Sequence, residues 1–186
     1  MTQQIKYKKC YIVRHAERYD FTYPFSWLIN CIFFKKDHDT PITEQGSIDA
    51  YNFGLYMYIH NFVPDVIFCS PYLRCKQTAL SIQKSLKENT GNDIEIIIDP
   101  LIRETKYEDV ELDELNERIK MIYNKLINSG KYKYPLLVTH ASIVYCLANI
   151  YENFKVTNYF KHMFQLRNMN YLGRCVLNKG KSYKYF

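Results

Sequence analysis

Two short apolar segments of the chain each end in a histidine. Residues 10–13 are apolar and partly β-branched, and Arg14 and His15 follow at once; residues 136–139 lead in the same way to His140. Such runs predict buried strands, and open α/β sheets bind ligands outside the carboxyl ends of their strands. Arg14 can hold an anion with two hydrogen bonds, and His15 can attack that anion or shuttle a proton. The sequence therefore predicts an anion-handling site where the two strands end.

An arginine and a glutamate follow two further predicted strands. The strand at residues 66–69 runs into Ser70 and Pro71, a pair that favours a helix start with serine as N-cap and proline at the first position. Arg74 lies one turn into that helix, whose N-terminus already favours anions. Glu104 follows the next strand and fits either a general acid or an exposed carboxylate paired with a neighbouring arginine. Taken singly, Arg74 and Glu104 are better interpreted as surface residues.

The spacing of apolar residues predicts the elements that must hold these side chains. Apolar residues three and four positions apart predict helices, and short β-branched runs predict strands. Helices are expected to start near Thr43, Ser70, residue 112 and His140, and strands to span residues 10–13, 66–69, 94–98, 136–139 and 173–178, with 183–186 as a further candidate. Strands that alternate with helices predict a three-layer α/β/α sandwich with a mostly parallel central sheet. The length fits one domain spanning residues 1–186.

Residues 19–39 form an aromatic-rich stretch directly after the first strand and show no clear period. An insertion at that place would sit near the active site as a lid or a wall. It fits a satellite of the hydrophobic core equally well, and a membrane-surface role is a weaker third interpretation. The sequence leaves these alternatives open.

Composition and charge argue against several classes of protein. The chain is 47% hydrophobic and 24% charged, which is typical of a soluble globular protein. The longest apolar stretch, residues 25–34, is shorter than the roughly 20 residues that cross a bilayer, and residues 1–9 lack the apolar core of a signal peptide. Six cysteines without zinc-ligand spacing predict reduced thiols and a cytoplasmic location. The net charge of +6 comes with scattered lysines, so no nucleic-acid partner is expected.

Five motifs stand in order along the chain. They are Arg14-His15, Asp39-x-Pro41-Ile42-Thr43-x-x-Gly46, Ser70-Pro71-x-x-Arg74-x-x-Gln77-Thr78-Ala79, Glu104 and Val138-Thr139-His140. This set resembles the histidine phosphatase superfamily, whose fold is phosphoglycerate mutase-like. Any one motif is a weak signal, whereas five in the family's order, covering nearly the whole chain, are specific.

One branch of that superfamily is especially similar. It comprises the phosphatase domain of the suppressor-of-T-cell-receptor-signalling proteins and the insect ecdysteroid-phosphate phosphatases, which act on protein phosphotyrosine and on steroid phosphates. Its pattern is seen at residues 14–20, 70–79 and 100–104. Ala16 agrees with this branch, since most of the superfamily has glycine there. Ala141 replaces another common glycine and Cys69 a common serine, changes that could tighten the site and lower the rate.

The resemblance implies a phosphomonoester phosphatase that needs no metal and no cofactor. His15 would attack phosphorus through one ring nitrogen to form a phosphohistidine, while its other ring nitrogen donates to a backbone carbonyl. The remaining roles fall to the phosphoryl-binding residues Arg14, Arg18, Arg74 and His140 and to Glu104, which protonates the leaving oxygen and then activates water. The expected substrates are aryl phosphates, such as protein phosphotyrosine, or a small aromatic or apolar phosphate ester.

Three other functions compete with this interpretation. A metal site of His15, His140 and Glu104 is disfavoured because Arg14 and Arg74 would repel the cation. A phosphoglycerate mutase-like or sugar-phosphate enzyme would keep the fold and change the reaction. A non-catalytic phosphate-binding protein is disfavoured because His15 and Glu104 are both present. The sequence leaves the oligomeric state open, including a homodimer.

Overall fold

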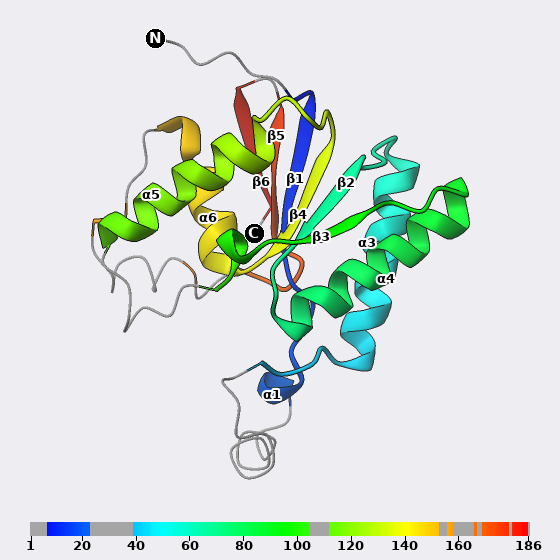
Figure 1. Cartoon of the computed structure of the whole chain (residues 1–186). Helices are drawn as coiled ribbons and strands as arrows, with labels where there is room; N and C mark the ends of the chain where they lie inside the picture. The colour runs from blue at the N-terminus through cyan, green and yellow to red at the C-terminus, as the bar shows by residue number, and fades with distance from the viewer. Residues whose placement is uncertain are drawn as a thin grey trace.

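The chain forms a mixed α/β structure around one six-stranded sheet. The computed structural model describes residues 7–22, 39–104, 112–152, 156–157, 166, 169–178 and 180–185. The strand order in the sheet is β3-β2-β4-β1-β5-β6 (Figure 1). The strands are β1 (Lys9–Arg14), β2 (Val66–Cys69), β3 (Ile96–Ile98), β4 (Pro135–Thr139), β5 (Arg174–Asn178) and β6 (Lys181–Tyr185). β4 and β1 therefore lie at the centre of the sheet.

Most of the sheet is parallel, as predicted. β3, β2, β4 and β1 run in the same direction, and β5 and β6 extend the sheet beyond β1 in antiparallel pairs. The strand predicted at residues 94–98 is shorter, since β3 begins at Ile96. The candidate strand at residues 183–186 forms as β6 and begins earlier, at Lys181.

The register between β1 and β4 determines which side chains meet at the carboxyl edge. Arg14 lies opposite Thr139, and the His15 backbone N–H donates to the Thr139 carbonyl oxygen at 2.9 Å. Parallel strands that end in register deliver their next residues to the same edge. His15 and His140 are therefore neighbours although 125 positions separate them in the sequence.

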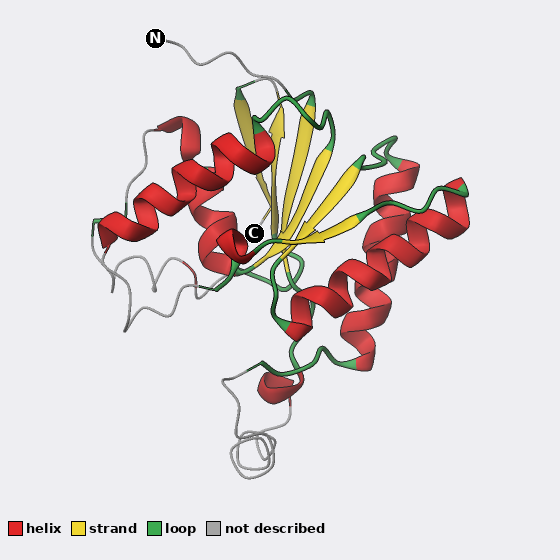
Figure 2. Ribbon diagram, in the orientation of Figure 1, coloured by secondary structure: helices red, strands yellow, loops and turns green. Residues whose placement is uncertain are grey.

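Helices cover both faces of the sheet (Figures 1 and 2). α3 (Glu44–Ile59) and α4 (Leu73–Thr90) lie on one face, and α5 (Leu112–Ile122) and α6 (Ala141–Ala148) lie on the other. Shorter helical segments are α1 (Tyr19–Thr22), η1 (Pro100–Ile102), the π-helical turn η2 (Tyr123–Ile127) and η3 (Ile150–Glu152). This arrangement is the predicted three-layer sandwich.

The side chains of β1 alternate between two hydrophobic cores. Cys10 and Ile12 pack with residues of α5 and α6, whereas Tyr11 and Val13 pack with residues of α3 and α4. Successive side chains of a strand point to opposite faces, so a strand buried on both faces is apolar throughout. The core on each side thus fixes the strand that carries Arg14 and His15.

The layer of α3 and α4 is held by a cap and a close helix contact. The Thr43 hydroxyl oxygen accepts a hydrogen bond from the Gly46 N–H at 2.9 Å, so the predicted N-cap of α3 is confirmed. At Gly54 an added Cβ would lie 2.8 Å from the Ile82 carbonyl oxygen and 2.8 Å from the Ser85 Cβ. The absence of a side chain at Gly54 is therefore what lets α3 approach α4.

The predicted start of α4 is wrong. The helix begins at Leu73, and its cap residue, Tyr72, makes no capping hydrogen bond through its side chain. The Ser70 N–H donates to the Val138 carbonyl oxygen at 3.0 Å, so the chain is still paired with β4 and is extended at this point. The Leu73 N–H is instead satisfied by Asp39 Oδ1 at 2.6 Å. A distant carboxylate thus replaces the local serine cap.

One prediction falls largely outside the described residues. The aromatic-rich stretch at residues 19–39 is described only at residues 19–22 and 39, so its proposed place over the site stays a prediction. Among the helices that the structure describes, none is both long and apolar enough to cross a membrane.

Candidate active site

The side chains that the sequence singles out converge at the carboxyl edge of the parallel strands. Arg14 ends β1 and His15 follows it, while His140 follows β4. Arg74 comes from the first turn of α4, and Glu104 comes from the loop after η1. The ring centroids of the two histidines are 5.5 Å apart, and Arg74 contacts both His140 and Glu104. Residues from motifs far apart in the sequence therefore lie together in one site.

His15 is held as a neutral, oriented imidazole. Its side chain is buried, and Nδ1 lies 2.8 Å from the Ala16 carbonyl oxygen. A carbonyl oxygen can only accept, so Nδ1 carries the proton and Nε2 keeps its lone pair. Burial, and then the positive charge of Arg74, hold the pKa of His15 well below its ordinary value. The predicted donation to a backbone carbonyl is confirmed, and it leaves Nε2 as the ring nitrogen that carries the lone pair.

Arg74 is a fully buried cation at the centre of the site. Its Nη2 donates to Glu104 Oε2, and its Nη1 lies 3.6 Å from Asp39 Oδ1. Its guanidinium carbon also lies 4.5 Å from the centroid of the Tyr72 ring. Glu104 and Asp39 are each more than a third exposed, so water shares their negative charges. Glu104 and Asp39 therefore hold the guanidinium in place, and water or another anion can replace either carboxylate.

His140 is bound through both ring nitrogens. Its Nε2 lies 2.8 Å from Ser70 Oγ, and its Nδ1 lies 3.3 Å from Arg74 Nη2 and 3.9 Å from Glu104 Oε1. Burial, followed by the charge of Arg74, holds the pKa of His140 well below its ordinary value. The second histidine is thus also neutral at pH 7.

Arg14 contributes a second guanidinium beside His15. Its Nη1 donates to the Met169 carbonyl oxygen, and its guanidinium carbon lies 4.5 Å from the centroid of the Tyr171 ring. Its Nε is buried and has no hydrogen-bond partner among the described residues. A buried donor without a partner is costly, and an anion in the site would satisfy it.

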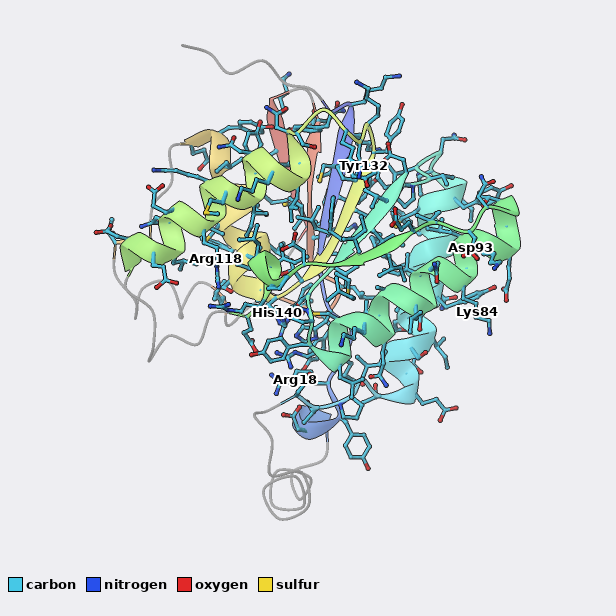
Figure 3. The ribbon with its side chains drawn as sticks, viewed as in Figure 1. Arg18, Lys84, Asp93, Arg118, Tyr132 and His140 are labelled. Atoms are coloured by element: carbon cyan, nitrogen blue, oxygen red, sulfur yellow. The ribbon has the colours of Figure 1, made fainter. Side chains whose placement is uncertain are left out.

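Arg18 lies on the same side of the molecule as His140 (Figure 3). Its Nε and Nη2 donate to the two carboxylate oxygens of Asp20 at 3.0 and 2.6 Å, and the Thr40 hydroxyl donates to Asp20 Oδ1 at 3.0 Å. The charge of Arg18 is one of the causes that lower the pKa of His140. Arg18 is therefore close enough to act electrostatically on the site while Asp20 fixes its guanidinium.

Four side chains at the site were missed as functional candidates in the sequence. Tyr72 packs edge-on against His140 with ring centroids 5.1 Å apart, and Tyr171 lies 6.0 Å from the ring of His15. Ser70 contacts His140, and Asp39 contacts Arg74. Ser70 and Asp39 are specified residues of the recognised motifs, so their place in those motifs was a signal that could have found them. Tyr72 occupies an unspecified position of its motif, and only the fold brings Tyr171 to Arg14, so these two had no comparable signal.

The arrangement can bind an anionic ester and cleave it. Arg14 and Arg74 supply fixed donors for an oxyanion, and His15 Nε2 supplies a lone pair for attack. Glu104 supplies a carboxyl group that can exchange a proton. Among the described residues, no three His, Cys, Asp or Glu side chains gather as a metal-binding group.

Comparisons with known proteins identify a family for the chain. A family model of the histidine phosphatase superfamily (branch 1) matches residues 10–113. The chain is 31% identical over 117 residues to ubiquitin-associated and SH3 domain-containing protein B of Mus musculus, covering 50% of this chain and 18% of that protein. It is 30% identical over 105 residues to ecdysteroid-phosphate phosphatase of Drosophila melanogaster, covering 44% of this chain and 14% of that protein. The matches thus span less than a fifth of the length of these relatives.

The fold is shared with solved structures. The chain superposes on the ecdysone phosphate phosphatase of Bombyx mori, solved in complex with tungstate, with a TM-score of 0.69 and 16% identity, over 95% of this chain and 91% of that chain. The family resemblance and the fold class predicted from the sequence are confirmed.

Proposed function

The chain belongs to the histidine phosphatase superfamily, and on that premise we propose that it hydrolyses phosphate monoesters through a phosphohistidine on His15. The observation that carries the proposal is the state of His15: a buried, neutral imidazole whose Nδ1 is bound to the Ala16 carbonyl oxygen. Such an imidazole has a free Nε2 lone pair and cannot turn to present the other nitrogen. The buried Arg74 beside it would keep an anionic substrate in place.

The reaction has two steps. In the first, His15 Nε2 forms a bond to phosphorus, the ester P–O bond breaks, and the carboxyl group of Glu104 gives its proton to the leaving oxygen. In the second, a water oxygen attacks phosphorus, the P–N bond breaks, and Glu104 takes a proton from the water. The products are an alcohol or phenol and inorganic phosphate, and His15 returns to its neutral form.

The charged side chains would stabilise the phosphoryl group. Arg14 offers its unpartnered Nε, and Arg74 offers the edge that Glu104 occupies in this structure. A phosphoryl oxygen that replaces the Glu104 carboxylate on Arg74 would free Glu104 to take up a proton from solvent and to face the leaving oxygen. His140 and Arg18 complete the set of groups proposed to contact the phosphate or the substrate. No metal ion has a role in this mechanism.

The proposed substrates are aryl phosphates, including protein phosphotyrosine, or small apolar phosphate esters. Two tyrosines support this choice, because Tyr72 and Tyr171 stack beside Arg74 and Arg14 and give the site aromatic walls. The ecdysteroid-phosphate phosphatase relative acts, by its name, on the phosphate of a steroid. A phenol leaves as an anion more readily than an alkanol, since its pKa is about 10. The five described cysteines are free and buried, which supports a cytoplasmic location for the protein.

Hydrolysis of p-nitrophenyl phosphate in the presence of EDTA tests the proposal. Wild type should release p-nitrophenol, and His15→Ala should lose the activity. His60→Ala is the matched control, because His60 is exposed at the end of α3 and should keep it. Activity that EDTA abolishes, or that survives in His15→Ala, would overturn the mechanism. Transfer of the phosphoryl group to a sugar phosphate instead of water would favour the mutase alternative.

A further inference from the structure

The contacts of His140 determine which of its ring nitrogens carries the proton. Arg74 Nη2, 3.3 Å from Nδ1, belongs to a guanidinium group that donates hydrogen bonds and cannot accept them. In the neutral ring, Nδ1 must therefore be the acceptor, and Nε2 must carry the hydrogen. That hydrogen points at Ser70 Oγ, 2.8 Å away, which is fully buried and can accept it.

His15 has the opposite arrangement. Its Nδ1 carries the hydrogen and donates to the Ala16 carbonyl oxygen, so its lone pair is on Nε2. The site in this structure therefore holds two neutral imidazoles in different tautomers, with lone pairs on Nε2 of His15 and on Nδ1 of His140. The first lone pair is needed for attack on phosphorus. The second lies next to Arg74 and Glu104, where a phosphoryl oxygen is proposed to bind.

A lone pair on His140 Nδ1 would repel a phosphoryl oxygen. Two lone pairs cannot form a hydrogen bond, whereas a protonated Nδ1 would donate a charge-assisted one. The ring takes a proton there only if it becomes an imidazolium, with Nε2–H still directed at Ser70. Ser70 Oγ can accept the hydrogen bond from Nε2 of neutral His140 and from Nε2 of its imidazolium, because Nε2 carries a hydrogen in both.

We propose that Ser70 is a positioning residue that keeps the proton of neutral His140 on Nε2, and that a phosphoryl dianion binds together with one proton, which is taken from solvent onto Nδ1 of His140. The inference rests on the proposed function, because it assigns the same site a phosphoryl ligand. It adds the protonation state in which that ligand is held. At His140 the step balances: one proton leaves the buffer and one N–H bond forms on Nδ1.

The charges around His140 explain why the proton arrives only with the ligand. The residues that face the ring are Arg74, Cys75 and Tyr72 from α4 and its cap, Ser70 after β2, Glu104 after η1, and Arg14, His15 and Arg18 from β1 and the residues after it. The arginines and the burial of the ring oppose the imidazolium in the free protein. A bound dianion adds two negative charges next to Nδ1 and reverses that balance.

Tungstate is a suitable probe, because it is a dianion at pH 8 and cannot be hydrolysed. Isothermal titration in two buffers with different ionisation enthalpies gives the number of protons taken up on binding, and we expect about one more for wild type than for His140→Gln. Two-bond ¹H–¹⁵N spectra of histidine-labelled protein report the tautomers directly. They should show His140 with Nε2–H in the free protein and with both nitrogens protonated in the complex, and His15 with Nδ1–H. His140→Gln assigns the signals.

Variants at Ser70 separate positioning from general stability. Ser70→Ala should weaken tungstate binding about tenfold or more and reduce the proton uptake, because the imidazolium loses its acceptor. Ser70→Thr keeps the hydroxyl and should restore both. Ser85→Ala is the matched control: Ser85 is also fully buried, but its hydroxyl has no hydrogen-bond partner among the described residues.

The possible outcomes distinguish the inference from the proposed function. Tungstate binding without proton uptake, or Nδ1–H on free His140, would overturn the inference and leave the phosphatase proposal intact. Binding and uptake by Ser70→Ala equal to wild type would overturn the role of Ser70. Failure of wild type to bind tungstate would overturn both the inference and the proposed function.

Discussion

Replacing Arg74 by methionine should remove most of the catalytic power at a smaller cost in stability. Methionine matches the length of the buried stem and deletes the guanidinium. In the transition state that group would donate two hydrogen bonds to phosphoryl oxygens, each worth about 1.5–3 kcal/mol because the partners are charged. The loss of about 3–6 kcal/mol corresponds to a fall in kcat/KM of roughly 10²- to 10⁴-fold.

The expected effect on stability is smaller for a structural reason. Breaking a buried ion pair costs about 3–5 kcal/mol of stability when it leaves an uncompensated buried charge. Here the carboxylates that lose their partner are Glu104 and Asp39, whose side chains are 36% and 38% exposed, and water can solvate both. The buried Nδ1 of His140 also loses its donor, which costs about 1–3 kcal/mol. We therefore expect Arg74→Met to lower the free energy of unfolding by about 1–3 kcal/mol.

The assay combines kcat/KM for p-nitrophenyl phosphate with urea unfolding of the same preparation. Arg103→Met is the control, since it removes one positive charge next to Glu104 from an exposed side chain and should keep kcat/KM within about threefold. A fall in kcat/KM of less than tenfold in Arg74→Met would refute the assignment of Arg74 as a phosphoryl-binding group. An equal fall in Arg103→Met would show that kcat/KM depends on the net positive charge and not on the position of the Arg74 guanidinium.

Glu104, the two site histidines and Gly54 are the subjects of three further predictions. Glu104→Gln should slow hydrolysis of alkyl phosphates more than of aryl phosphates, because a phenol needs less protonation on leaving; equal losses on the two substrates would argue against the acid role. The pKa values of His15 and His140 are lower in the folded than in the unfolded chain, so the unfolded chain binds more protons just below the ordinary histidine pKa of about 6.5. Stability to urea should therefore fall as pH drops below about 6.5, and less steeply in His140→Asn; an unchanged slope in that variant would contradict the neutral state. Gly54→Ala should lower the free energy of unfolding by about 1–3 kcal/mol, since its methyl group would overlap the Ile82 carbonyl and the Ser85 side chain; unchanged urea unfolding would show that α3 and α4 can move apart.

Much of the candidate site could be predicted because a strand is recognisable from a short stretch of sequence, and because the carboxyl ends of parallel strands meet at one edge of the sheet. Residues 10–13 and 136–139 are recognisable by composition alone, and a parallel sheet necessarily brings the residues after such strands to one edge. Arg14, His15 and His140 are therefore found from short patterns. Arg74 and Glu104 needed the order of the motifs, because each alone is typical of the surface.

The remaining contacts could not be predicted because they depend on tertiary structure. Ser70 and Pro71 carry a strong local signal for a helix start, yet the hydrogen bond from Ser70 to β4 keeps the chain extended there. The serine hydroxyl is thereby free to bind His140, and a carboxylate from Asp39 caps the helix instead. In each case a long-range partner overrides a local preference.

Trapping the covalent intermediate tests the central claim most directly. Glu104→Gln should form the intermediate from p-nitrophenyl phosphate and hydrolyse it slowly, because the water loses its base. Rapid quenching in alkali, followed by peptide mass spectrometry, should find one phosphoryl group on His15. The release of p-nitrophenol should show a burst equal in amount to the enzyme present. Release of p-nitrophenol with no phosphoryl group on His15, or with that group on another residue, would contradict the account.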